Sequence, residues 1–445
     1  MKRPTRISLV LALVVVSAAL AGCLPRQLVV WSPDGDRAVV ATGKATAICD
    51  GDGKLAETDI GVVTAAAWLP DSKKVILSVQ TTAKKWDELA KALDEPTAKA
   101  AADAANQLEQ AVLQIPEGQP LDDEQTGQIA KKVFDKKGSI APAAMLCLRD
   151  THPDVLKKRL GEKWASMETL TVTYSSLGVY DLADMKLKAG PVIHNYLQAV
   201  NEIRLRPDGK ALAVVASSDK TGDALALSVV KVAAKAAPVE VADMVAAFPD
   251  WSADGHLVYI ESAGVKNDKP IDIGTLVRKL IPEDGADVEA QELATVVFDQ
   301  TQAVRCLSDG RIIFASAEQA LPAAAGAAQN KQQFFACTPG QQDQVGQVKP
   351  LFADANEVPY SPFFELSPDG KQIVVTDQAK VAVVNLADGK LTWVSEAEGK
   401  LQSLPSWRKA GEVCYVIPPA KEKENARAEV ALWSAGKTTV ISKAW

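Results

Sequence analysis

The chain contains few of the residues on which most catalytic and metal sites depend. Of its 445 residues only three are histidines, His152, His194 and His256, and they are far apart in the sequence. This spacing fits no metal site, in which ligands recur a few residues apart. No Gly-x-Ser-x-Gly sequence occurs, so the nucleophile elbow of serine hydrolases is missing. The sequence therefore predicts no catalytic residue, no metal and no cofactor.

The sequence also has no excess of positive charge. Lysine and arginine number 49 against 56 aspartate and glutamate residues, which gives a formal net charge of −7. No basic stripe interleaved with aromatic residues is present, and this argues against a nucleic-acid groove. Removing residues 1–22 would take Lys2, Arg3 and Arg6 away and leave a net charge of −10.

The N-terminus carries an export signal. The three basic residues precede an almost unbroken apolar run, residues 7–19, which is too short for a comfortable membrane span. Leu20-Ala21-Gly22-Cys23 follows and resembles the lipobox of bacterial lipoproteins. The resemblance implies cleavage before Cys23 and attachment of acyl chains such as palmitate to that residue. An ordinary signal with a stray cysteine and a retained anchor helix are the alternatives.

This resemblance implies a location. Residues 1–22 would be the signal peptide and 23–27 the lipidated N-terminus and a short tether. The chain would be held on the periplasmic side of the bacterial envelope, because two or three acyl chains anchor firmly. Leu24, in place of the aspartate that retains some lipoproteins at the inner membrane, favours the outer membrane.

Five cysteines remain after Cys23, an odd number, so at least one thiol is unpaired within the monomer. Most of them lie in apolar, strand-like runs, and we expect them to be small buried side chains. Cys306 and Cys337 are predicted in the first and third strands of one sheet, two inter-strand spacings apart. That separation is too wide for a disulfide.

A hairpin motif recurs through the rest of the chain, most clearly at Phe364–Asp377. An apolar run meets Ser-Pro-Asp-Gly, a second apolar run follows, and the glycine accepts the φ > 0 position of the turn. The aspartate position of the seven copies reads Asp34, Asp71, Asp208, Asp254, Asp309, Asp369 and Ala410. The position three residues earlier reads Trp31, Trp68, Leu205, Trp251, Cys306, Leu366 and Trp407. The clearest structural turn pairs are Asp34 with Gly35, Asp208 with Gly209, Asp254 with Gly255, Asp309 with Gly310, and Asp369 with Gly370.

The spacing of the copies predicts the fold class. Five of the six intervals are 37 to 60 residues, the size of one four-stranded propeller blade, and the sixth is 137. We therefore predict an all-β, seven-bladed β-propeller over residues 28–445, with a helical insertion in blade 2. A sandwich would not repeat its turn chemistry at such intervals. Six or eight blades remain open if the last copy or the longer units are misassigned.

The Trp-Ser-Pro-Asp-Gly pattern resembles the WD40-like (PD40) repeats of TolB-type periplasmic propellers. The resemblance covers most of residues 28–443 and implies the fold, but not an activity, because propellers host unrelated functions. TolB carries a separate α/β domain and no lipid, whereas this chain lacks the first and has the signal for the second. Its partners are therefore not transferred.

Four long excursions follow the second strand of a predicted blade, and so should decorate one face of the propeller. They cover residues 82–167, 262–270, 318–332 and 418–427. The first contains helical periodicity at Ala98, Ala101, Ala105, Leu108 and Val112, after Pro96, which suits a first helical turn. A shorter helical segment is predicted at Ile129, Val133 and Phe134, and another around Leu156 and Leu160. We interpret residues 83–165 as a helical insertion: a cap over the channel, an arm that docks a partner, or a weakly structured excursion.

The sequence thus favours a non-enzymatic, protein-binding scaffold anchored to the membrane, with another envelope protein as partner; whether a small ligand binds is open. One rival is a propeller lyase, lactonase or hydrolase, which would need polar side chains converging on the central channel from several blades. The other is a structural lipoprotein without a specific ligand.

Overall fold

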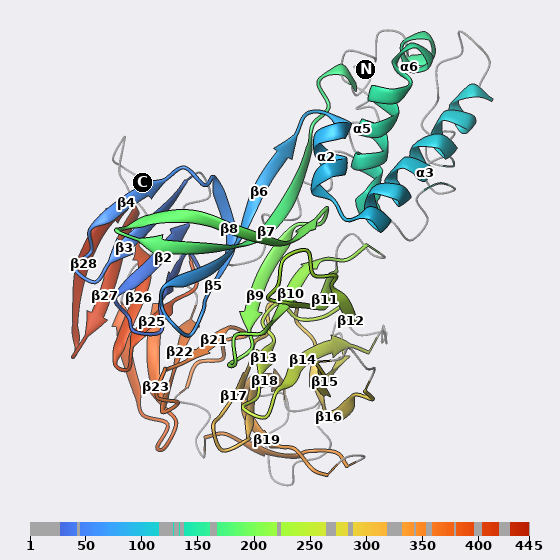
Figure 1. Ribbon diagram of the computed structural model, residues 1–445. Helices are drawn as coiled ribbons and strands as arrows, with labels where there is room; N and C mark the ends of the chain where they lie inside the picture. The colour runs from blue at the N-terminus through green and yellow to red at the C-terminus, as the bar shows by residue number, and fades with distance from the viewer. Residues whose placement is uncertain are drawn as a thin grey trace, which may run out of the picture.

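The computed structural model of the protein describes residues 27–41, 45–114, 128, 133, 138–160, 167–219, 224–263, 273–283, 288–317, 332–341, 344–352, 358–377, 380–395, 403–417 and 428–444. These residues form seven four-stranded antiparallel sheets, each built from four strands that are consecutive in the chain. The first strands of neighbouring sheets lie side by side around a common centre, and β25 meets β1. The predicted all-β, seven-bladed propeller is confirmed (Figure 1).

The blades follow chain order. Blade 1 is β1 Val29–Trp31, β2 Arg37–Ala41, β3 Thr46–Asp50 and β4 Leu55–Thr58; blade 2 is β5 Val62–Trp68, β6 Lys74–Ala83, β7 Val172–Ala183 and β8 Lys186–Tyr196. Blade 3 is β9 Val200–Leu205, β10 Ala211–Ser217, β11 Leu225–Lys231 and β12 Val239–Asp243; blade 4 is β13 Asp250–Trp251, β14 His256–Ser262, β15 Ile273–Leu280 and β16 Gln291–Val297. Blade 5 is β17 Val304–Cys306, β18 Ile312–Ala317, β19 Gln332–Thr338 and β20 Gln347–Pro350; blade 6 is β21 Phe364–Leu366, β22 Gln372–Asp377, β23 Lys380–Asn385 and β24 Leu391–Ser395. Blade 7 is β25 Ser406–Lys409, β26 Glu412–Ile417, β27 Ala428–Ser434 and β28 Lys437–Ala444.

Each repeated turn closes in the way its sequence dictates. In blade 6 the Asp369 carboxylate accepts the Lys371 amide at 3.2 Å, and Gly370 adopts φ +68°. In blade 2, where serine replaces glycine, Ser72 itself takes a left-handed φ of 57°. The seventh copy shortens the turn to Ala410-Gly411, with Gly411 at φ +77°, so no aspartate is needed there.

The ring closes without strand exchange, because blades 1 and 7 are each made from one contiguous segment. Side chains join them instead. The Arg408 guanidinium donates to the Gly35 carbonyl at 2.9 Å and lies over the Trp31 ring, and Lys409 pairs with Asp36 at 3.3 Å. A shared apolar cluster that includes Val29 and Cys414 fills the seam.

Helices interrupt the second sheet in chain order. They lie between β6 and β7: α2 Trp86–Ala92, α3 Glu95–Leu113, the 3₁₀ turn η2 Gly138–Ile140, α5 Ala141–Thr151 and α6 Pro153–Leu160. We call these helices the helical arm. Ala83 pairs with Val172 at the ends of β6 and β7, so the two strands form the stalk of the arm, which projects away from the sheets (Figure 1).

The two predicted helical patterns correspond to α3 and α6. Asp94 caps α3 by accepting the Thr97 amide at 2.7 Å, and Pro96 occupies the first turn as expected. The predicted helix around residues 129–134 lies outside the described residues except for Val133. Helix α5 was not predicted, because its side chains are buried almost all round and show no polar face. Within the described part of the chain, no helix is both long and apolar enough to cross a membrane.

The five cysteines after Cys23 are all free; four are buried and Cys306 is half-buried. Burial raises the pKa of the Cys49 and Cys337 thiols to about 11. The residues of the predicted lipobox, Leu20, Ala21, Gly22 and Cys23, lie outside the described residues.

Candidate functional site

A layer of alternating charges crosses the centre of the propeller. At the position just before the tryptophan column, blades 3 to 6 carry Arg204, Asp250, Arg305 and Glu365 in succession, on their innermost strands. The other three blades have valine, alanine and serine at this position. Because the first strands converge at the centre, the four charged side chains can meet there.

The four side chains form one ion-pair network. Arg305 holds Glu365 with two hydrogen bonds, Nε–Oε1 at 2.9 Å and Nη2–Oε2 at 2.7 Å. Arg204 donates to Glu365 Oε1 at 3.1 Å and to Asp250 Oδ1 at 2.9 Å. The other oxygen of Asp250 accepts the Cys306 amide at 2.8 Å. The network therefore links blades 3, 4, 5 and 6, including blades that are not neighbours.

Burial makes this network energetically important. The Arg305 side chain is 1% exposed and Glu365 11%. Burial by itself would raise the pKa of Glu365, but the charges and hydrogen bonds of Arg204 and Arg305 outweigh it and lower that pKa to about 2. Burial would lower the pKa of Arg204, and Glu365 and Asp250 raise it instead. Glu365 and Arg204 are therefore both ionised at neutral pH.

Glu202 is the one acidic group near the network without a partner of this kind. It lies two residues before Arg204 on β9, and no other described residue makes a hydrogen bond to its carboxylate. Burial raises its pKa to about 7, although Arg204 and Arg305 act in the opposite direction, and Glu365 adds to the rise. A carboxyl group that titrates near neutrality is the kind of group that general acid–base chemistry uses.

The tryptophan column joins adjacent blades. The indole N–H of Trp68 donates to the Val30 carbonyl at 2.9 Å, and that of Trp251 to the Arg204 carbonyl at 3.0 Å. Trp407 donates to the Glu365 carbonyl, also at 3.0 Å. Each acceptor is the residue just before the column in the preceding blade. At the seam the Trp31 Nε1 is buried and has no hydrogen-bond partner among the described residues.

Trp407→Phe is expected to lower the free energy of unfolding by about 1–2 kcal/mol more than Trp31→Phe, because only the first leaves a buried carbonyl without its donor. The two rings are equally buried, at 7% exposure, so both variants lose the same volume. Urea unfolding followed by circular dichroism measures the difference. Equal losses would mean that the indole hydrogen bond contributes nothing.

The predicted turn residues lie on the rim just beyond the ends of the first strands and do not form a site. The turns of adjacent blades touch, as in the hydrogen bond from the Asp34 amide to Ser72 Oγ at 3.2 Å. Each aspartate of the five pairs is engaged within its own turn, and their glycines have φ between +68° and +87°. The sequence Asp50-Gly-Asp-Gly53 has some likeness to a calcium loop, but it forms the turn between β3 and β4, in which Asp50 accepts the Asp52 and Lys54 amides at 3.0 and 2.8 Å. No group of metal-ligand side chains large enough to hold an ion occurs in the described ranges.

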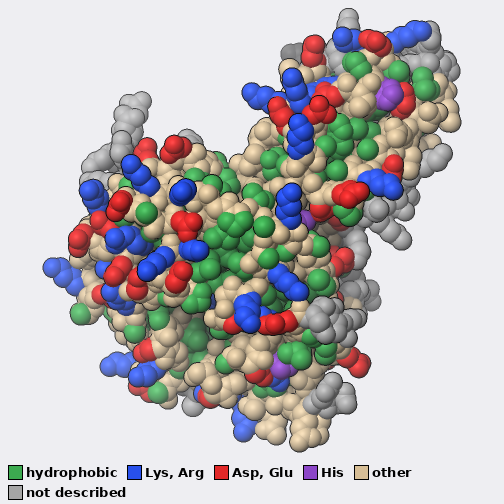
Figure 2. Space-filling model, viewed as in Figure 1, with side chains coloured by type: hydrophobic (Ala, Val, Ile, Leu, Met, Phe, Trp, Pro, Cys, Tyr) green, Lys and Arg blue, Asp and Glu red, His purple; other side chains and the backbone are tan. Residues whose placement is uncertain are grey.

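The helical arm is a second candidate, because it has a hydrophobic core of its own. Leu89, Leu108, Leu146 and Leu156 meet in this core, together with residues at the ends of β6 and β7. Figure 2 shows the arm as a lobe set apart from the body of the propeller. Because the described helices share a packed core, they do not form the weakly structured excursion that was one of the three interpretations of residues 83–165.

A buried arginine fixes the arm to its stalk. Arg149, on α5, donates to the Lys84 carbonyl just after β6 at 2.5 Å and to the Leu170 carbonyl just before β7 at 2.6 Å. Its Nε pairs with Asp150 at 2.7 Å. The guanidinium thus contacts the chain where it leaves β6 and where it enters β7, and this fixes the orientation of the arm on its stalk.

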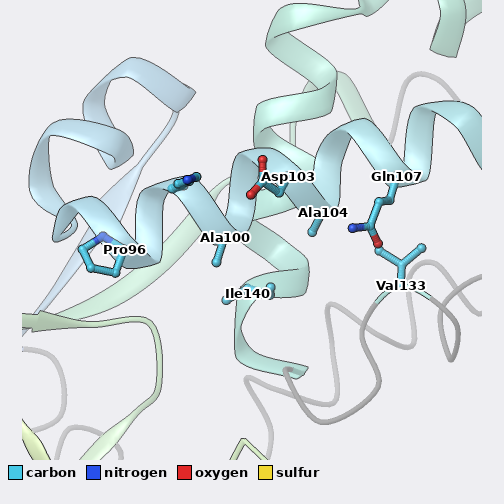
Figure 3. A pocket seen from close by; sticks show the side chains of 8 residues that line it. Pro96, Ala100, Asp103, Ala104, Gln107, Val133 and Ile140 are labelled. Atoms are coloured by element: carbon cyan, nitrogen blue, oxygen red, sulfur yellow. The ribbon is translucent and has the colours of Figure 1, made fainter.

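The arm also contacts blade 2 and the connection between blades 2 and 3. Asn195 of β8 donates to the Ala92 carbonyl at 2.6 Å, and Gln198 donates to Ser139 at 3.2 Å. A shallow groove runs along α3 and faces Ile140 and Val133 (Figure 3). Lys99, Asp103 and Gln107 line it beside alanines, a mixed surface without converging catalytic groups.

Comparison with known proteins adds the following. No protein-family model and no curated protein matches the sequence. Among solved structures, TolB from Acinetobacter baumannii is similar at 17% identity and a TM-score of 0.38, over 59% of this chain and 57% of that one. The β-propeller domain of Cps50 (Swd1) from Myceliophteria thermophila matches at 9% identity and a TM-score of 0.49, over 92% and 97% of the two chains.

A puromycin hydrolase matches at 12% identity and a TM-score of 0.49, over 96% of this chain and 55% of that one. The chain thus spans little more than half the length of the TolB and hydrolase chains.

Proposed function

We propose that the protein is a membrane-anchored lipoprotein of the bacterial envelope, and that its propeller is a non-enzymatic scaffold on which the helical arm binds another envelope protein. The single observation that carries the proposal is the construction of the arm. It has a separate core, a stalk of two paired strands and a buried arginine that sets its direction. A cap would cover the centre of the ring, whereas this lobe contacts blade 2 and the connection between blades 2 and 3 and extends away from the body of the propeller (Figure 2).

The test is removal of the arm. Because Ala83 and Val172 face each other in register, residues 84–171 can be replaced by Asn-Gly, which closes the two strands as a hairpin. We expect the shortened protein to keep its propeller fold, seen as retained β circular dichroism and cooperative melting. We also expect it to lose the partner that in-envelope crosslinking and mass spectrometry recover with the full chain.

A matched control separates loss of the arm surface from loss of its orientation. Arg149→Met changes no exposed residue of the arm but removes the hydrogen bonds to the Lys84 and Leu170 carbonyls beside the stalk strands. We expect the yield of crosslinked partner with this variant to lie between the yield with the full chain and the yield with the shortened protein. Recovery of the same partners by all three proteins would overturn the proposal.

The anchor has its own test. Labelled palmitate should enter the wild-type protein and not the Cys23→Ser variant. Incorporation into neither would remove the lipid from the proposal and leave the arm as a binding element.

A second function, an enzyme acting at the central channel, is favoured by one observation. Charged side chains converge there from four blades, and Glu202 has a pKa of about 7. Against it, Arg204 and Arg305 are already engaged by carboxylates. Lactone or ester turnover that Glu202→Gln abolishes would favour this function over the scaffold.

A further inference from the structure

The place where the chain enters the propeller is fixed. Gln27 donates through Nε2 to the Pro405 carbonyl at 3.1 Å, next to the start of β25. The Leu28 carbonyl then accepts the Ala41 amide at 2.8 Å, and Val29 is buried. The chain is therefore held against blades 7 and 1 from Gln27 onward.

Gln27 and the helical arm lie on the same face of the propeller. Every first strand starts at this face and ends at the opposite rim, where the repeated turns touch one another. The second strand of each blade returns, so β6 ends at the face where β1 begins. We call this surface the tether face.

The connection from Cys23 to Gln27 is short compared with the arm. Four residues span at most about 14 Å when fully extended. Helix α3 alone, with 19 residues, is about 28 Å long. Lipid attached at Cys23 is therefore held within a distance of Gln27 that is shorter than α3.

We infer that the bilayer lies against the tether face and that the outer end of the arm touches its surface. The inference rests on the proposed lipid anchor, since it is the acyl chains on Cys23 that bring the bilayer within the length of residues 23–26. Helix α6, at the outer end of the arm (Figure 1), fits this contact, because it carries Lys157 and Lys158, and both are exposed. Lysine side chains near an anionic lipid surface are attracted to it.

The partner proposed above would then be met at the bilayer. A protein inserted in, or attached to, the same membrane could reach the arm, while the rim of repeated turns would face away from it.

The test compares two lysines on opposite faces. A coumarin amino acid replaces either Lys158, on the arm, or Lys371, in the turn after Asp369, both of which are exposed. The full lipidated protein is reconstituted into phosphatidylethanolamine–phosphatidylglycerol vesicles that carry nitroxide headgroups. Quenching is expected to be several-fold stronger at position 158 than at 371. Equal quenching at both, or stronger quenching at 371, would overturn the inference.

Two controls separate this inference from the anchor. The mass of the N-terminal peptide shows whether cells acylate Cys23. If they do not, the proposed anchor is wrong. Coupling Cys23 to a maleimide phospholipid then still allows the orientation of the propeller on the bilayer to be measured. A long Gly-Ser insertion after Arg26 should reduce quenching at position 158 several-fold. Quenching unchanged by that insertion would contradict the argument from tether length.

Discussion

Arg305→Met is expected to lower the free energy of unfolding by about 3 kcal/mol or more, because removing one partner of a buried ion pair typically costs 3–5 kcal/mol. The variant would leave Glu365 buried with one guanidinium in place of two. Arg204 still contacts it but is shared with Asp250, which places the loss at the lower end of the range.

The matched control lies in the same blade. Arg311 pairs with Asp309 at 2.7 Å, and both side chains are about half exposed. Arg311→Met should therefore cost under about 1 kcal/mol. Guanidinium unfolding of the two variants at neutral pH and equal ionic strength makes the comparison. Similar small losses would show that the central network does not hold the blades together.

Glu202→Gln is expected to stabilise the protein at pH 8 but hardly at pH 5. The pKa of Glu202 is about 7 in the folded protein against an ordinary value of 4.5, so folding favours the protonated carboxyl. The stability linked to it is fully present below pH 4.5 and is lost as the pH rises through 7. The free energy of unfolding falls by as much as about 3 kcal/mol over this range. A glutamine at this position does not ionise, so the variant does not lose this stability.

The measurement is the difference in unfolding free energy between variant and wild type at pH 5, 6, 7 and 8. A constant offset from the substitution cancels when these differences are compared. Glu57→Gln, at an exposed position on β4, controls for the removal of one negative charge. A difference that does not change with pH would mean that Glu202 is ionised in the folded protein throughout this range.

The sequence predicted well whatever depends on neighbouring residues. Ser367-Pro-Asp-Gly370 forms its turn through contacts within five residues, and its recurrence at blade-length intervals was enough to predict seven blades. The α3 helix was also predicted, because its cap, its proline and its apolar face are all local.

The central network could not be recognised in the same way, because Arg204 and Glu365 are 161 residues apart and meet only when the ring has closed. A signal was nevertheless present. The column before the tryptophans reads Arg204, Asp250, Arg305 and Glu365, an alternation of sign that aligned repeats make visible. The tryptophan column was also visible in the aligned repeats, but the hydrogen bond of its indole to the preceding blade was not predicted.

The separation between these partners also governs the order in which the molecule can be completed. A chain that is made, or exported, from its N-terminus delivers Arg204, Asp250 and Arg305 before Glu365 exists beside them. Until blade 6 arrives, Arg305 would have no carboxylate to neutralise it, and a half-built ring would bury an unpaired charge. Blades 3 to 5 should thus stay open to water until the sixth is available, so the arrival of blade 6 sets the moment at which these three blades become native.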